Sequence, residues 1–163
     1  MSAIISISLK PHVSKNSKSD RQVILEFLSK NVLATISTVD SRTLQPESAL
    51  IAFCELDTLE IIFITRIDSR KYNNLSKNNK VALVIGWEFN AEKWETLQYE
   101  GESNLVIGRE YMKYRRIFAM KEGTPCSEEF LSNPSMKLFK VIPTWIGYSD
   151  FRGKEPKVIE IHI

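Results

Sequence analysis

The chain has 163 residues, of which 43% are hydrophobic and 26% charged, and its formal net charge is +2. This length and composition predict one globular domain, residues 1–163, with a core large enough to fold unaided. The small charge excess argues against a nucleic-acid partner, and the absence of a run of about 18 apolar residues argues against a membrane span. Two cysteines and two histidines, in no ligand-like spacing, predict no metal site. We expect a cytoplasmic protein.

Seven segments have the apolar and β-branched composition of strands: residues 33–39, 48–55, 59–65, 81–87, 96–106, 136–148 and 157–163. Residues 1–18 are expected to form a loose arm. Ser19 and Gln22 have the spacing of a capping box that starts a helix, and further helices are predicted at residues 69–77, at 109–120 and after Ser127. Because strands and helices do not alternate regularly, we predict a mostly antiparallel barrel rather than a doubly wound parallel sheet.

Three local patterns refine this prediction. The apolar run from Leu50 to Cys54 indicates a strand that is covered on both faces, with Cys54 a small buried hydrophobe. Pro143 predicts a kink or an edge position in the long strand. The aromatic residues Tyr111, Tyr114 and Phe118 recur at helical spacing, which favours core or dimer contacts.

The stretch from Ile62 to Lys71 carries the main functional signal. An apolar strand ends at Thr65, a short loop follows, and a helix is predicted to begin near Ser69. Arg70 and Lys71 would then lie in the first helical turn, where the partial positive charge of the helix disfavours cations. A bound anion such as phosphate would resolve this conflict. The alternative is that both side chains simply reach into water.

An ordered set of motifs extends from about residue 33 to 161. It comprises Gln45-Pro46, Ala49 to Cys54, Ile64-Thr65, Ser69-Arg70-Lys71, Asn78-Asn79 and Trp87, then Pro143 to Tyr148, Pro156 and Val158 to Glu160. This set resembles the pyridoxamine 5'-phosphate oxidase family of FMN-binding proteins, especially its short members described as general stress proteins. The resemblance implies a mainly β (α+β) fold, an antiparallel split β-barrel of about six or seven strands with inserted helices.

The resemblance also implies a cofactor site for FMN. Arg70 and Lys71, in the motif that Ser69 opens, would hold the FMN phosphate. Thr65 and the backbone at Ile64 would contact the flavin or its ribityl-phosphate chain. The remaining implied contacts are the main chain of Ala49, Leu50 and Ile51 against the isoalloxazine ring, and the side chain of Thr96. The family forms homodimers with FMN at the subunit interface, so a second copy of the chain is the expected partner.

The departures from the family's pattern concern the substrate. Ala49 and Cys54 stand where the oxidase has Arg and Lys, the closing Arg-rich motif is absent, and His162 aligns with a flavin-side Trp. We therefore expect pyridoxamine 5'-phosphate to be a poor substrate. His162 over the flavin, or stacking by Trp87 and Trp94, is a further possibility, although surface or packing roles are more common for such residues.

Three functions fit these residues. The first is a flavin oxidoreductase that transfers a hydride or an electron to or from a small molecule through the flavin, since the cofactor supplies the redox chemistry. The second is a non-catalytic module that binds FMN for storage or redox sensing. The third is a split barrel that binds another ligand such as haem, an alternative that the scarcity of histidines disfavours and His162 keeps open. The sequence identifies no catalytic residue.

Overall fold

The structure is a computed structural model that describes residues 18–86, 94–124 and 128–163. The expected N-terminal arm therefore lies almost wholly outside the described residues, as does Trp87. The strands are β1 Leu33–Val39, β2 Pro46–Glu55, β3 Ile61–Arg66, β4 Lys80–Ile85, β5 Glu95–Leu105, β6 Met136–Asp150 and β7 Lys157–His162. The helices are α1 Lys18–Ser29, α2 Arg70–Leu75, α3 Gly108–Met120 and α4 Glu128–Ser132.

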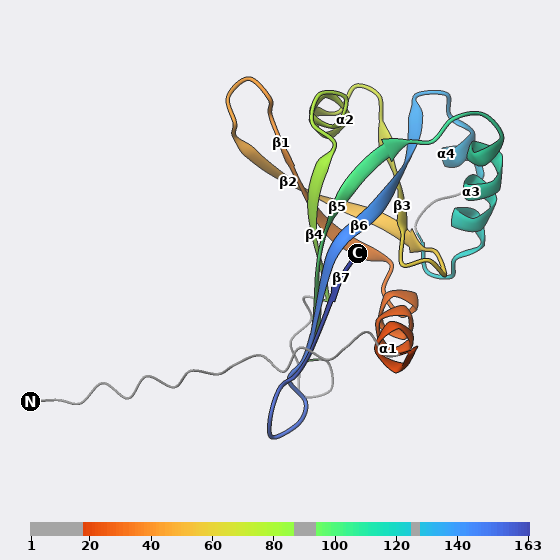
Figure 1. Cartoon of the computed structure of the whole chain (residues 1–163). Helices are drawn as coiled ribbons and strands as arrows, with labels where there is room; N and C mark the ends of the chain where they lie inside the picture. The colour runs from red at the N-terminus through yellow and green to blue at the C-terminus, as the bar shows by residue number, and fades with distance from the viewer. Residues whose placement is uncertain (1–17, 87–93, 125–127) are drawn as a thin grey trace, which may run out of the picture.

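The strands form one antiparallel sheet that closes on itself. Their order is β3-β2-β1-β4-β5-β6-β7, and β3 also pairs with β6, so six strands close a barrel and β7 adds to β6. Figure 1 shows α1 at one end of the barrel, α2 at the other end, and α3 and α4 together along its side. The predicted antiparallel split barrel of six or seven strands with inserted helices is confirmed.

Alternation along the strands builds the core inside the barrel. In β4, Val81, Leu83 and Ile85 are buried while the residues between them are exposed, as a period of two requires. Phe27 and Leu28 of α1 extend this core at one end of the barrel. The predicted capping box is wrong, because α1 begins at Lys18 and Ser19 therefore lies inside the helix.

A second core lies outside the barrel, between the sheet and the helices α3 and α4. It contains Tyr114 and Phe118 of α3, with Tyr111 packed at its border, and Cys54 of β2. Phe53 and Cys54 are both buried, which confirms a strand covered on both faces at this end of β2. The prediction is wrong for Leu50, which is 60% exposed because this part of β2 does not belong to the outer core formed with α3.

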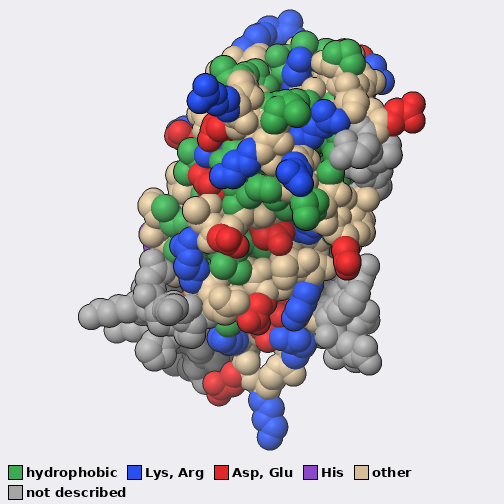
Figure 2. Space-filling model, turned by 90° about the vertical axis from the view of Figure 1, so that its right-hand side faces the viewer, with side chains coloured by type: hydrophobic (Ala, Val, Ile, Leu, Met, Phe, Trp, Pro, Cys, Tyr) green, Lys and Arg blue, Asp and Glu red, His purple; other side chains and the backbone are tan. Residues whose placement is uncertain are grey.

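The outward side of α3 is mixed in character. Met112 is 63% exposed on this helix, and Arg109, Lys113 and Arg116 are also exposed. Figure 2 shows hydrophobic side chains interspersed with Lys and Arg over the upper part of this face of the molecule. Scattered exposed hydrophobic residues of this kind need no partner.

Pro143 marks the point at which β6 changes partner. β6 pairs with β3 over Met136–Val141 and with β7 over Trp145–Asp150. Its register with β5 shifts opposite Pro143, between Glu100 and Gly101. A proline has no N–H to donate. Pro143 can occupy this position because it lies at a bulge, after the pairing with β3 has ended and before the pairing with β7 begins. The predicted kink is confirmed, and it lies in an interior strand rather than an edge strand.

The barrel is open between β2 and β3. These strands pair only where Phe53, Cys54 and Glu55 lie opposite Phe63, Ile62 and Ile61. Beyond this point β2 continues with β1 while β3 continues with β6, and the two strands diverge (Figure 1). Helix α2 contacts β1 and β3 at this opening. We call this opening between β2 and β3 the split. The predicted phosphate-binding residues lie at the same end of the barrel as the exposed part of β2.

Candidate functional site

Thr65 and Ser69 fix the beginning of α2. Thr65 ends the buried part of β3 and is 4% exposed, and its Oγ1 lies 2.9 Å from the Oγ of Ser69. The same Ser69 oxygen accepts a hydrogen bond of 3.1 Å from the backbone N–H of Tyr72, so Ser69 is the N-cap of α2. The predicted helix start is confirmed. Because Ser69 already satisfies this N–H, the helix end by itself does not require an anion.

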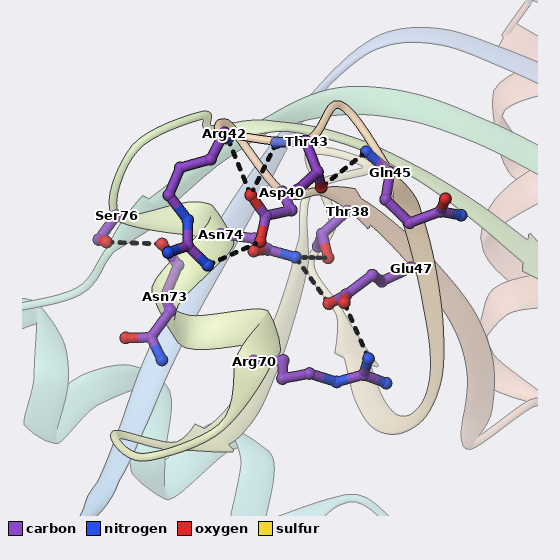
Figure 3. Close-up of polar contacts among 10 residues, drawn as sticks. All are labelled: Thr38, Asp40, Arg42, Thr43, Gln45, Glu47, Arg70, Asn73, Asn74 and Ser76. Carbon is purple, nitrogen blue, oxygen red and sulfur yellow. Dashed lines mark hydrogen bonds and ion pairs between the residues drawn. The ribbon is translucent and has the colours of Figure 1, made fainter.

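Arg70 extends toward the β1–β2 hairpin. Its Nη1 donates to Oε1 of Glu47 at 2.8 Å, and its side chain remains 80% exposed. The other oxygen of Glu47 accepts from Nδ2 of Asn74 at 3.0 Å, and that amide also lies 3.1 Å from Oγ1 of Thr38 (Figure 3). Arg70 therefore has a carboxylate partner within the chain, which sequence reasoning missed.

Lys71 differs from its neighbour Arg70. Its side chain is half-buried, and burial lowers the pKa of its ammonium group. Within the described residues, no carboxylate, carbonyl or hydroxyl group accepts a hydrogen bond from Lys71 or pairs with it. Taking a cation out of water without a partner is costly, so an anion at this position would be stabilising. Lys71 is the cation of the site that is suited to a ligand.

The predicted flavin-facing residues of β2 and β3 lie on either side of the split. Leu50 is exposed, Ala49 and Ile64 are half-buried, and Ile51 points into the barrel core. Among the described strands, β1 is the one that pairs with β2 at these positions, because the pairing with β3 ends at Phe53. The opposite edge of the β2 backbone is therefore left facing the opening.

Thr96 is not brought to this cluster. It lies in β5, three strands away from β2 in the sheet order, and its Oγ1 donates to the carbonyl of Ile85 at 3.3 Å. Within one copy of the chain, the predicted cofactor residues thus form two separate groups. Arg70, Lys71, Ser69, Thr65, Ile64, Ala49, Leu50 and Ile51 lie around the split, and Thr96 lies across the sheet.

A hollow of about 310 Å³ adjoins the split. It lies between the β1–β2 hairpin and α2, and Arg42, Arg70 and Lys77 line it together with Asp40 and Glu47. Two backbone N–H groups, those of Arg42 and Thr43, donate to Asp40 and lower the pKa of its carboxyl group (Figure 3). The carboxylates therefore offset part of the positive charge in this hollow.

A family model described as pyridoxamine 5'-phosphate oxidase matches residues 21–150. The chain belongs to this family. No curated protein matches it. The similar solved structures described next are 10–18% identical to it, and their likeness shows the fold alone.

Among these structures is General Stress Protein 26 from Bacillus anthracis, with 18% identity, a TM-score of 0.66, and coverage of 88% of this chain and 98% of the other. A pyridoxamine 5'-phosphate oxidase-related, FMN binding protein from Nostoc punctiforme has 17% identity, a TM-score of 0.64, and coverage of 91% and 93%. A haem-binding protein from Mycobacterium smegmatis has 10% identity and a TM-score of 0.70. The match covers 92% of this chain and 60% of that protein.

Cys54 and His162 are two of the positions at which this member departs from the family's sequence pattern. Cys54 is 4% exposed in the outer core, and burial raises the pKa of its thiol to about 11, as expected for an inert structural cysteine. His162 is exposed and lies opposite Trp145 in the β6–β7 pair. The described residues contain no cluster of metal-ligating side chains.

No helix in the described part of this family member is both long and apolar enough to span a bilayer.

Proposed function

We propose that this chain binds FMN at the opening between β2 and β3 and acts as a flavin oxidoreductase. The observation that carries the proposal is Lys71, a half-buried cation with no acceptor among the described residues, on the helix that Ser69 caps. Membership of the pyridoxamine 5'-phosphate oxidase family supports it, as does the fold shared with an FMN binding protein. The cofactor phosphate would supply the anion that Lys71 lacks.

The residues at the split suit the parts of such a cofactor. Lys71 would bind the phosphate, and the hydroxyl groups of Thr65 and Ser69 would orient its ester end. The free backbone edge of β2 at Leu50 could bind the polar edge of the ring, because Ala49 and Ile51 direct their main-chain groups toward β1, and N–H and C=O groups need partners when they are covered. FMN, when bound, supplies the electron-transfer chemistry.

A homodimer would complete this site. Leu50 and Val84 are 60% and 44% exposed, and both lie opposite Thr35 of the strand between them, so two exposed hydrophobic side chains flank Thr35 on the outside of the sheet. On the same sheet, the ring of Trp145 lies against Gly147, where an added Cβ would come within 2.5 Å of it. We propose that a second copy packs on this face and contributes its own Thr96 to the split of the first copy, because one copy alone leaves Thr96 three strands away from β2.

The first test is the visible spectrum of the purified protein, followed by titration with FMN. A charge-assisted hydrogen bond contributes about 1.5–3 kcal/mol, so Lys71→Ala should weaken FMN binding about 10- to 100-fold. Lys154→Ala, which removes an exposed lysine of the β6–β7 loop, is the matched control and should leave the affinity unchanged. Failure of the wild type to bind FMN would overturn the proposal.

The same preparation separates the remaining functions. Turnover of NADH or NADPH with an electron acceptor would support an oxidoreductase, whereas tight FMN binding without turnover would indicate storage or redox sensing. A Soret band, retained in place of flavin bands, would identify a haem protein. Pyridoxamine 5'-phosphate should give little turnover, because Ala49 and the buried Cys54 provide no cation for a second phosphate.

A further inference from the structure

Glu47 is an anion of the chain itself, placed beside the proposed phosphate site. Its side chain is only 17% exposed, and its two oxygens have different partners. Oε1 accepts from Arg70 at 2.8 Å, and Oε2 accepts from Asn74 at 3.0 Å (Figure 3). The inference drawn from this arrangement rests on the proposed function, since it concerns how the same site recognises phosphate.

Glu47 cannot follow Arg70 if that side chain moves. Asn74 is 5% exposed and Thr38 is 2% exposed, and the Asn74 amide contacts both Thr38 and Glu47. Glu47 also lies directly opposite Thr38 in the β1–β2 register. The carboxylate is therefore fixed from two sides, whereas the guanidinium group of Arg70 is 80% exposed and has room to turn.

Because Glu47 is fixed and Arg70 is free to turn, Arg70 can pair either with Glu47 or with a ligand phosphate, and the two choices have opposite effects on binding. If Arg70 turns to a phosphate, a mostly buried carboxylate keeps only the amide of Asn74 and remains near another anion. Leaving a charged group with fewer partners is unfavourable, and like charges at close range repel. If Arg70 stays with Glu47, the phosphate is left to Lys71, which has no competing acceptor among the described residues.

We propose that Glu47 competes with the flavin phosphate for Arg70, so that Lys71 provides most of the phosphate selectivity of the site. Glu47 is thus a positioning residue that acts through Arg70. Its removal should strengthen the binding of a phosphorylated flavin, although it deletes an interaction that is present in the protein without ligand.

The test compares FMN with riboflavin, which shares the ring and lacks the phosphate. In Glu47→Gln, the ratio of riboflavin Kd to FMN Kd should rise about two- to fivefold, the range expected when the guanidinium partner of an ion pair is exposed to solvent. Riboflavin affinity itself should stay constant, which reports that the ring site is intact. Arg70→Ala should lower the ratio by no more than about fivefold, and Lys71→Ala should lower it by about tenfold or more.

A double variant isolates the competition. In Glu47→Gln combined with Arg70→Ala, the gain from Glu47→Gln should disappear, because the released guanidinium group is no longer present. Glu129→Gln, which removes an exposed carboxylate on α4, is the control for a general change in net charge. An unchanged or lower ratio in Glu47→Gln overturns the inference, as does a loss in Arg70→Ala equal to that in Lys71→Ala. A wild type that binds neither flavin overturns the proposed function and this inference together.

Discussion

Lys121 and Glu55 form an ion pair that ties the end of α3 to the end of β2. Nζ of Lys121 lies 2.5 Å from Oε2 of Glu55, and the lysine side chain is 7% exposed. The same ammonium group donates to the carbonyl of Leu28 in the last turn of α1 at 3.2 Å and to that of Asn31 just after this helix at 2.6 Å. It also lies over the ring of Phe53. One side chain thus joins three separate elements.

Replacing this lysine should destabilise the fold. In Lys121→Met the apolar part of the side chain is kept, but Glu55 and two carbonyl groups lose their donor. Removing one partner of a buried ion pair typically costs about 3–5 kcal/mol. Urea unfolding followed by circular dichroism would measure the loss, with Lys113→Met on the exposed side of α3 as the control. Equal midpoints for the two variants would show that the contacts of Lys121 add little.

Ser103 should be replaceable without loss. Its side chain is 3% exposed in β5, and its Oγ has no hydrogen-bond partner in the described structure. An unpaired buried hydroxyl group is unfavourable, so Ser103→Ala should leave the free energy of unfolding unchanged or raise it by up to about 1 kcal/mol. The same denaturation experiment tests this. A clear loss of stability would mean that the hydroxyl group has a partner after all.

Asp150 should contribute stability that depends on pH. Arg152 donates to its carboxylate through Nε at 2.8 Å and Nη2 at 2.7 Å. These bonds, together with the backbone N–H of Arg152, lower the pKa of Asp150 from 3.8 to about 2. A carboxyl group whose pKa is lower in the folded state stabilises that state above its ordinary pKa, and the contribution is lost as the pH falls through the lowered value.

Asp150→Asn should therefore be less stable than the wild type at pH 7. The difference should shrink between about pH 4 and about pH 2, the window set by the ordinary and the lowered pKa. Denaturation midpoints measured across this range provide the test. A difference that stays constant with pH would exclude ionisation of Asp150 as its source.

Leu50 should be important for assembly rather than for folding. It is 60% exposed in one copy of the chain, so Leu50→Lys should leave the thermal midpoint of the monomer nearly unchanged. If the outer face of β2, β1 and β4 is the dimer interface, the added charge would be buried without a partner and the dimer should dissociate. Sedimentation at several concentrations would measure this. Met112→Lys, at 63% exposure on α3, is the matched control and should not change the assembly.

The local elements of this fold could be predicted from the sequence. The first strand was predicted at residues 33–39 and lies at Leu33–Val39, and Ser69 caps α2 as its position indicated. Tyr114 and Phe118 are buried, in agreement with their helical spacing. These features depend on side-chain period and on capping chemistry, which are local properties of the chain. The start of α1 was misplaced for the same reason that helix ends are hard to assign, since several polar residues there can precede a helix.

By itself, the sequence determined the sheet-forming segments, the helix that begins after Ser69 and the pair of cations that follows. Only the tertiary structure decided how those cations differ. Arg70 meets Glu47 across 23 residues of chain, while Lys71 lies half-buried with no described partner. The exposure of Leu50 and the separation of Thr96 from the split were decided in the same way. The reason is that these distances depend on which strands pair and on where β2 separates from β3, and contacts between segments far apart in the chain do not follow from local side-chain period.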